Sequence, residues 1–438
     1  MTIKIIGAGL AGCEAASLLS RCGAKVILFE QKPKKHSPAH SKDGFAELVC
    51  SNSLKADRLS SAGGLLKAEM RLFGSVCLEA AEICRVKAGG ALAVDRDKFS
   101  QYITDKISND PNIEIRHEEV TLIPTDAPVI VASGPLTDGK LYDEIGALCG
   151  GRLSFYDAAA PIVTADSIDM NSAFTQSRYE GGEGDYINCP MNKEEYEAFY
   201  EALVNAQSAM LHEFDKPTVY EGCMPIEIMA KRGADTIRFG PMKPVGLRDP
   251  RTGHRPWAVV QLRRENADGT MFNLVGFQTN LKFGEQKRVF SMIPALKNAE
   301  FTRYGVMHRN TFICSPKLLN SFFAMRSNEN IAFAGQMTGV EGYMESAMSG
   351  IVAALGMFAR LSGTPLDDIP MGTMMGALSA YISDPTVVDF QPMGANFGLL
   401  PKPEQRIKNK QERYTLIANG ALSEMKKYRE YVKGRIGI

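Results

Sequence analysis

The sequence predicts an α/β fold with a Rossmann-like nucleotide-binding domain and an inserted α+β domain, and three observations lead to this prediction. A strand, a glycine-rich turn and a helix open the chain. A second apolar strand, Ala127 to Thr137, ends in small residues, and a late segment, Glu329 to Leu355, repeats the strand, glycine turn and helix. Between these elements, the spacing of apolar residues changes to short alternating runs, which are typical of antiparallel strands.

The first unit covers residues 3 to 30. IKIIGAG reads as a buried strand, AGCEAASLLSRCG as a helix ending at Gly23, and AKVILFE as a second strand that ends in Glu30. Gly7, Gly9 and Gly12 complete the pattern G-x-G-x-x-G, which permits a tight turn and a close approach of the backbone to a pyrophosphate at the helix N-terminus. Glu30 stands where a carboxylate accepts hydrogen bonds from ribose hydroxyls. We therefore expect a dinucleotide site, with cofactor-binding residues Gly7, Ala8, Gly9, Leu10, Ala11, Gly12 and Glu30.

The late return to the sheet indicates which dinucleotide binds. The segment ENIAFAGQMTGVEGYMESA places Gly335, Gln336 and Gly339 in a second glycine turn. A late second turn favours FAD and the two-dinucleotide-fold class of flavoproteins. Such flavoproteins often carry an Asp in this turn, where this chain has Gln336.

Three parts of the chain are expected: residues 1–185 as the first part of the FAD-binding domain, 186–325 as the insertion, and 326–438 as the second part with a basic helical tail. The insertion begins with an acid-rich amphipathic helix after residue 190. It continues with three segments that look like strands, TIRFGPM, WAVVQLRR and MFNLVGFQTNL.

Bulk composition excludes few functions. Fifty basic and fifty acidic residues cancel over 438 residues, so the net charge neither supports nor excludes an RNA partner. Two regions are locally basic: residues 231–264 have nine Lys or Arg and two Asp, and residues 401–438 have ten Lys or Arg and four Glu. Such clusters suit a polyanion, although a solvated helix face explains the tail equally well.

Nine scattered cysteines read as free thiols, and none has the CxxC spacing of a zinc or dithiol site. No segment reads as a signal peptide or a membrane span, so we expect a cytoplasmic protein.

Cys50 and Cys223 differ from the other cysteines in their surroundings. Cys223 lies in YEGCMPIEIMA, beside Gly222 and just before an expected short helix, where a thiol pKa is lowered. Cys50 ends the apolar run FAELVC and precedes what looks like a helix start. From position alone, a structural role for each cysteine competes with a catalytic one.

Seven segments carry a resemblance to a known family: GAGLAGCEAA, FAELVCSNSLKAD, GGALAVDRDKFS, YEGCMPIEIMA, RFGPMKPVGLRDPRTG, YGVMHRNTF and AGQMTGVEGYMESA. Together they closely resemble the folate- and FAD-dependent tRNA uracil-5-methyltransferase family, TrmFO, over nearly the whole chain. The related GidA or MnmG flavoproteins share the flavin fold but have longer chains, with an additional helical C-terminal domain.

The resemblance implies formation of 5-methyluridine in the T-loop of tRNA, with methylenetetrahydrofolate as carbon donor and NADH or NADPH supplying electrons through FAD. It implies that Cys223 attacks uracil C6 and that Cys50 removes the C5 proton, although the two roles could be exchanged. A thiol base needs a pKa only modestly below its usual value of about 8.5. For substrate binding, the candidates are His308 for folate and Arg248, Arg251 and Arg255 for RNA. His308 as a structural histidine remains an equal alternative.

Other functions stay open at this point. The same chemistry on a ribosomal RNA uridine, an NAD(P)H oxidoreductase acting on small molecules, and a flavin-binding RNA partner without turnover are all compatible with the glycine motifs. No metal, membrane or obligate protein partner is expected.

Overall fold

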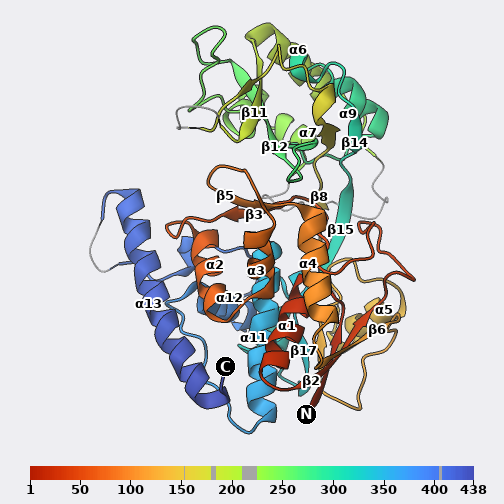
Figure 1. The fold of residues 1–438 in the computed structure, drawn as a ribbon, viewed down its shortest axis with the longest axis vertical. Helices are drawn as coiled ribbons and strands as arrows, with labels where there is room; N and C mark the ends of the chain where they lie inside the picture. Colours follow the sequence, from red (N-terminus) through yellow and green to blue (C-terminus); the bar gives the residue numbers. More distant parts are fainter. Residues whose placement is uncertain (152, 179–183, 210–223, 404–406) are drawn as a thin grey trace.

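The structure is a computed structural model that describes residues 1–438 apart from 152, 179–183, 210–223 and 404–406. Its strands form two six-stranded sheets, one in each of two stacked parts, together with a small three-stranded sheet and a two-stranded ladder. Figure 1 shows the larger part, which contains both chain termini, below the inserted part.

The first sheet has the order β16-β17-β7-β1-β2-β6. Its strands are β1 (Thr2–Ile6), β2 (Lys25–Glu30), β6 (Ile113–His117), β7 (Val129–Val131), β16 (Ala324–Met325) and β17 (Asn328–Phe333). All neighbours are parallel except β16 and β17. The predicted strands at both ends of the chain therefore meet, because β7 lies between β1 and β17. The α/β class and the Rossmann-like arrangement are confirmed.

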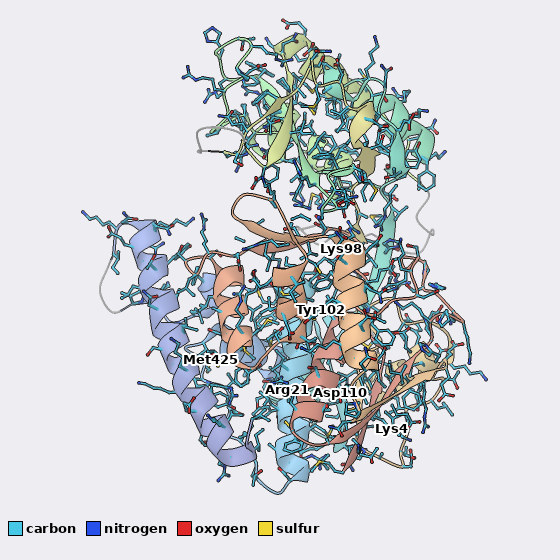
Figure 2. The ribbon with its side chains drawn as sticks, viewed as in Figure 1. Lys4, Arg21, Lys98, Tyr102, Asp110 and Met425 are labelled. Carbon is cyan, nitrogen blue, oxygen red and sulfur yellow. The ribbon has the colours of Figure 1, made fainter. Side chains whose placement is uncertain are left out.

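The larger part has helices on and beside this sheet. They are α1 (Leu10–Arg21), α2 (Ala62–Leu72), α3 (Val76–Ile83), α4 (Arg96–Ser108), α5 (Gly139–Leu148), α10 (Ser315–Leu318), α11 (Tyr343–Leu361), α12 (Met374–Ser383) and α13 (Lys410–Ile436), with the 3-10 turns η4 (Gln336–Thr338) and η5 (Phe397–Leu399). Helices α1, α4 and α11 contact the sheet, and α13 packs against α2. In Figure 2, Met425 lies on α13. This side chain is fully buried in the core of the larger part, so the basic tail is a packed helix with one apolar face.

One helix, α11, is long and apolar enough to cross a membrane by length and composition alone. In this fold it packs against α1, and 78% of its apolar window is buried inside the protein. The apolar sequence of α11 is therefore explained by its place in the core.

The second sheet has the order β10-β11-β12-β13-β9-β14 and is antiparallel throughout. Its strands are β9 (Ile162–Thr164), β10 (Phe174–Thr175), β11 (Tyr186–Met191), β12 (Ala258–Arg264), β13 (Met271–Leu274) and β14 (Phe301–Arg303). The helical elements here are η1 (Ala165–Ser167), α6 (Lys193–Val204), α7 (Ile226–Ala230), α8 (Ala234–Phe239), α9 (Phe283–Phe290) and η3 (Pro294–Leu296).

The strand pairings move the expected boundaries of the insertion. Strands β9 and β10 belong to the second sheet, so the expected boundary at 185/186 falls inside that sheet. A two-stranded ladder of β8 (Leu153–Ala158) and β15 (Met307–Phe312) joins the two parts. The insertion therefore extends from Ile162 to Arg303 rather than from 186 to 325. Strands of two or three residues give too little alternation for the sequence to reveal them.

Two local expectations are wrong. TIRFGPM was expected to be a strand, but α8 occupies Ala234–Phe239, with Ile237 buried and Phe239 63% exposed. The segment after Cys50 begins strand β3 (Ser53–Ala56) rather than a helix. Strand β3 pairs with β5 (Ala91–Val94), which also pairs with β4 (Arg85–Val86). Pairing with a distant strand overrides the local helix signal there.

Candidate active site

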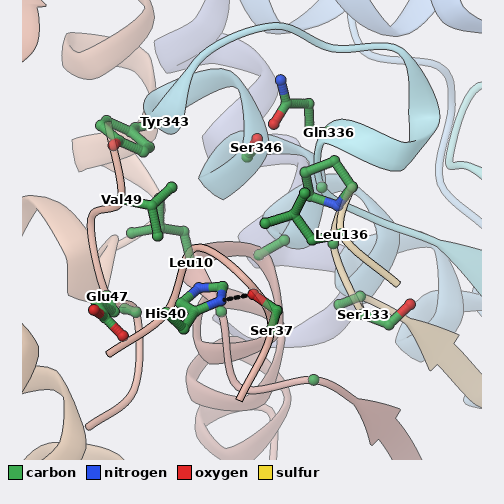
Figure 3. A pocket seen from close by; sticks show the side chains of 18 of the residues that line it. Leu10, Ser37, His40, Glu47, Val49, Ser133, Leu136, Gln336, Tyr343 and Ser346 are labelled. Atoms are coloured by element: carbon green, nitrogen blue, oxygen red, sulfur yellow. Dashed lines mark hydrogen bonds between the residues drawn. The ribbon is translucent and has the colours of Figure 1, made fainter. Parts of the chain in front are cut away.

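A cavity of about 480 Å³ opens between the two glycine turns. Its lining includes eight of the ten residues expected to bind the cofactor: Gly7, Ala8, Gly9, Leu10, Ala11, Glu30, Gly335 and Gln336. In Figure 3, Leu10 lies at the start of α1, between Val49 on one side and Leu136 on the other. The cavity therefore lies at the carboxyl ends of β1 and β17, where open α/β sheets bind their ligands.

The three glycines of the first turn have different functions. Gly7 has φ +99°, and a Cβ there would lie 2.5 Å from the Ala132 carbonyl oxygen. A Cβ at Gly12 would lie 1.8 Å from the Gly7 carbonyl oxygen, so Gly12 allows α1 to pack on the turn. Gly9 lines the cavity, and a Cβ there would meet nothing within 4 Å. Gly9 is thus the position where a ligand can approach the backbone, while Gly12 packs behind the turn and does not line the cavity.

Glu30 ends β2 at the cavity wall. One carboxylate oxygen accepts a hydrogen bond from the Ala8 amide at 2.9 Å, and the other accepts one from the Lys32 amide at 3.0 Å. Each carboxylate oxygen can accept a further hydrogen bond, so Glu30 retains acceptor capacity toward the cavity.

The second turn is built differently. Gly335 has φ +85° and lines the cavity, whereas a Cβ at Gly339 would lie 2.4 Å from the Phe390 ring. Gly339 is therefore a packing residue, as Gly12 is. Gln336 donates from its amide to the Glu341 carboxylate at 2.6 Å. Burial, together with the charge of Asp157, raises the pKa of Glu341 to about 8.

These features fit FAD. Helices α1 and α11 both begin at the cavity without a side-chain cap, so their first amide groups remain available for an anion. The open side of Gly9 admits a pyrophosphate, and Glu30 suits a ribose. Gly7, Gly9, Glu30 and Gly335 are the residues that would hold the cofactor.

Cys50 lies at the same cavity, half-buried, in contact with the first residue of α11. The hydroxyl of Tyr343 is 3.0 Å from the Cys50 sulfur. That hydroxyl also accepts hydrogen bonds from the amides of Cys50 at 2.8 Å and Ser51 at 3.2 Å. Since its lone pairs are engaged by two amides, its own proton is directed to the sulfur. Tyr343 is thus placed to stabilise a Cys50 thiolate.

Burial nevertheless raises the pKa of Cys50 to about 11, and the negative charge of Asp157 adds to this effect. The Tyr343 hydrogen bond and the charge of Arg96 act in the opposite direction. The pKa of Cys50 therefore lies above the modestly lowered value that a thiol base needs, because the cost of burying a thiolate exceeds the two favourable contacts. With this pKa, Cys50 is a neutral thiol at pH 7.

Three arginines fix the loop that carries Cys50. Arg96 donates to the carbonyl oxygens of Leu48 at 2.8 Å and Cys50 at 3.4 Å, and it pairs with Glu265 of the insertion. Arg303 donates to the carbonyl of Val49.

Arg263 completes this set from β12. It donates to the side chains of Asn52 at 2.9 Å and Ser51 at 2.8 Å. Arg263 was counted as part of the basic RNA-facing cluster, but it is only 7% exposed and holds the cysteine loop instead.

Cys223, the other expected catalytic thiol, lies outside the described residues. The described chain resumes at Met224, and the amide of Ile226 donates to the carbonyl of Gln278 at 2.7 Å. Gln278 lines the cavity. On the N-terminal side of residues 210–223, the amide of Ala209 donates to the Asn280 carbonyl at 2.7 Å. Described residues before and after 210–223 therefore both hydrogen-bond to the segment 278–280.

His308 also lines the cavity, on the ladder strand β15. Its Nε2 is buried and has no hydrogen-bond partner among the described residues. Burial and the charge of Arg303 lower the pKa of His308, so its ring is neutral. A neutral ring with an open nitrogen suits a polar heterocycle, which keeps His308 as a candidate folate contact.

The other three predicted substrate residues do not line the cavity. They lie in the loop between α8 and β12, where Arg251 forms an ion pair with Asp249 at 2.7 Å and Arg248 donates to the Gly253 carbonyl at 3.1 Å. Arg255 is exposed. Contact with RNA remains a prediction for this loop.

Tyr343 and Arg96 were missed as site residues. Both stand in segments that resemble the family, AGQMTGVEGYMESA and GGALAVDRDKFS, but neither has a local pattern that distinguishes it from a packing residue. No group of three or more His, Cys, Asp or Glu that could hold a metal ion occurs in the described part of the chain.

A Rossmann-type sheet with two glycine turns that face one cavity defines a flavoprotein of the FAD-binding class. The chain belongs to the family described as glucose inhibited division protein A, whose model matches residues 2–365.

Close relatives of the chain confirm the TrmFO resemblance. The chain is 56% identical over 427 residues to the methylenetetrahydrofolate--tRNA-(uracil-5-)-methyltransferase TrmFO of Acetivibrio thermocellus, covering 97% of this chain and 98% of the relative. It is 55% identical over 430 residues to the protein of the same name from Listeria monocytogenes serotype 4b, covering 98% and 99%.

Among solved structures, GidA of Aquifex aeolicus in its form I crystal matches with a TM-score of 0.70 and 17% identity. The match covers 99% of this chain and 77% of the other, and at this identity it supports the fold alone.

Proposed function

We propose that this protein methylates uridine C5 in the T-loop of tRNA, giving 5-methyluridine, with methylenetetrahydrofolate as the carbon donor. The observation that carries the proposal is the Cys50–Tyr343 contact at the FAD cavity, in a chain that is 56% identical to a relative named for this reaction. We further propose NADH or NADPH as the reductant and the cytoplasm as the location.

Uracil C5 is a weak nucleophile, so a thiolate must first add to C6 and move electron density to C5. We assign this attack to Cys223. The activated C5 then forms a bond to the methylene carbon of the folate donor. The C5 proton leaves to Cys50 as the bond from this carbon to the donor nitrogen breaks, which releases tetrahydrofolate and leaves an exocyclic methylene on C5. A hydride that originates from NADH or NADPH adds to this methylene as the C6–sulfur bond breaks, which gives the methyl group and returns the Cys223 thiolate. FAD supplies the redox chemistry when it is bound.

For Cys50 to accept this proton, it must first become a thiolate. Tyr343 and Arg96 are the groups that favour the charged sulfur. A bound base that excludes water and approaches this pair would place the thiolate beside the C5 proton. The target uridine must be turned out of its stack to reach this cavity, as is general for enzymes that act on bases.

The test is methyl transfer from labelled methylenetetrahydrofolate to a T-arm transcript, with S-adenosylmethionine as a competing donor. We expect label in the RNA only from folate, and transfer only from S-adenosylmethionine would overturn the proposal. A ribosomal RNA fragment run in parallel separates the two RNA substrates.

The two thiols are tested by Cys223→Ala and Cys50→Ala. Both should abolish methylation while FAD stays bound, because neither residue belongs to the glycine turns. Retained methylation by both variants would remove the catalytic assignment. Flavin turnover with NADH in the absence of RNA and folate, combined with no methylation, would favour a small-molecule oxidoreductase.

A further inference from the structure

Three aromatic rings form a continuous stack at the edge of the insertion: Phe283 on α9, Phe301 on β14, and Tyr304 directly after β14. The ring of Tyr304 is the middle one: its centroid is 4.9 Å from that of Phe283 and 5.3 Å from that of Phe301, with interplanar angles of 15° and 10°. Phe301 packs against the core of the insertion, whereas Phe283 is 55% exposed. The stack therefore runs outward and ends in an aromatic ring exposed to solvent.

The stack is held rigidly by Gln286, which is fully buried on α9. The Gln286 side chain accepts from the Gly305 amide at 2.8 Å and donates to the Gly305 carbonyl at 2.8 Å. Because Gly305 follows Tyr304 and Gln286 lies one turn after Phe283, this pair of bonds fixes the two rings relative to each other. Because the rings of the stack are already ordered, they lose little conformational entropy when a planar ligand binds.

The position of the stack connects it to the reactive site. Arg303, directly before Tyr304, donates to the carbonyl of Val49, the residue before Cys50. On the other side, a Cβ at Gly305 would lie 2.6 Å from the carbonyl oxygen of Ala159, which lines the cavity. Figure 1 shows α9 and β14 above the ladder strand β15. Strand β15 contributes His308 and Asn310 to the cavity lining.

The surroundings favour a polyanion. Residues 282–300 contain four Lys or Arg and two Glu. One of these acids, Glu285, is engaged with Arg288 at 2.6 Å. Lys282, Lys287 and Lys297 are exposed. An aromatic face among cations is the combination with which proteins bind unpaired nucleotides, since the ring stacks on a base and the cations contact phosphates.

We propose that the exposed ring of Phe283 stacks on an unpaired base of the substrate RNA, next to the uridine that enters the cavity. This inference rests on the proposed RNA substrate and adds a specific contact to it. Phe283 is a positioning residue, because it holds the RNA and touches neither the target base nor the cofactor.

The test compares Phe283→Leu with Phe283→Tyr in the full-length, FAD-loaded protein. Because the variant loses the stacking of an aromatic ring on a base, Phe283→Leu should weaken binding of a T-arm transcript about tenfold. The same variant should raise KM for RNA and leave kcat at saturating RNA unchanged. Phe283→Tyr keeps a flat ring and should behave as the wild type. A 2-aminopurine placed beside the target should be quenched by the wild type and by Phe283→Tyr only.

The control variant is Leu122→Ala, which removes an apolar side chain of similar exposure, 65%, from the FAD-binding part. It should leave RNA affinity unchanged, and FAD absorbance should be normal in all three variants. Equal affinity of Phe283→Leu and wild type for an RNA that the wild type methylates overturns this inference and leaves the function standing. Failure of the wild type to bind or methylate RNA overturns both. Loss of self-association in Phe283→Leu, with RNA affinity unchanged, would identify a second copy as the occupant instead.

Discussion

The two glycine turns share one design but differ in the helix that comes after each turn. Helix α1 begins with Leu10, Ala11 and Gly12, and its first turn has no acidic residue. Helix α11 begins with Tyr343, with Glu341 just before it and Glu345 in its first turn. Both turns thus offer uncapped helix amides to an anion, but only the second also places a proton donor, Tyr343, against the Cys50 sulfur. The second turn therefore adds control of the thiol to cofactor binding.

The strongest way to break the first turn is Gly12→Val. A Cβ at this position overlaps the Gly7 carbonyl at 1.8 Å, so we expect a loss of about 3 kcal/mol or more in the free energy of unfolding. Urea unfolding followed by circular dichroism measures this. Gly9→Ala is the matched control and should fold normally, since its Cβ meets nothing within 4 Å. Equal stability of Gly12→Val and wild type would contradict the packing function given to Gly12.

The next largest expected effect is on FAD affinity, and it should differ between Glu30 at the first turn and Glu341 at the second. Glu30→Ala removes the acceptor at the end of β2 and should weaken FAD binding roughly 10- to 100-fold, since hydrogen bonds to a charged group contribute about 1.5–3 kcal/mol. Glu341→Gln should change the affinity much less, because Glu341 contacts Gln336 in the second turn. Titration of apoprotein with FAD, followed by fluorescence, gives both affinities. If the two variants lose equal affinity, the proposed division between the turns is wrong.

A smaller effect is expected for Tyr343→Phe. The variant removes the proton donor that contacts the Cys50 sulfur at 3.0 Å, and we expect methylation to fall about tenfold. Methylation by the wild type should rise with pH as Cys50 ionises toward its pKa of about 11, and the variant should need a higher pH for the same rate. FAD affinity serves as the control and should not change. An unaltered pH profile in Tyr343→Phe would argue against Cys50 as the base.

The last prediction concerns stability and pH rather than ligand affinity or reaction rate. The pKa of Glu341 is raised from 4.5 to about 8 in the folded state, so the folded state holds this proton more tightly than the unfolded state does. The resulting stability is fully present below pH 4.5 and is lost as pH rises toward 8. In Glu341→Gln, the fall of Tm over this range should be less steep than in wild type, as calorimetry can measure. A fall equally steep in both proteins would place the titrating group elsewhere.

The sequence alone predicted the elements whose signals are local. The first unit fits within thirty residues and contains a strand, the three glycines, a helix and the terminal Glu30 in that order. Few structures other than a dinucleotide site need these elements at this spacing. The same is true of the turn at Gly335 and of helix α6, where Asn192 and Glu195 form a capping box. Local chemistry and tertiary structure agree in all of these elements.

The parts that could not be predicted depend on partners distant in the sequence. Tyr343 reaches Cys50 across almost three hundred residues, and no pattern around either residue indicates this contact. The pKa of Cys50 depends on burial and on Asp157, which the sequence places far from it. In the same way, the sequence around Arg263 predicts a surface cation, whereas the structure shows buried hydrogen bonds from Arg263 to Ser51 and Asn52. Long-range packing determines the electrostatics of a site, and a single sequence does not contain it explicitly.

The position of β17 in the first sheet affects how the chain is completed during synthesis. Strand β7 needs β17 as its outer neighbour, and Val131 pairs with Phe333 across the whole insertion. The insertion has its own core and pairs its strands over shorter separations, so it can pack while the ribosome has not yet released β17. The nucleotide-binding half that begins first is therefore finished last. Until then, the edge of β7 that β17 covers in the finished sheet is unpaired, and this is the stage at which the chain is most exposed to aggregation.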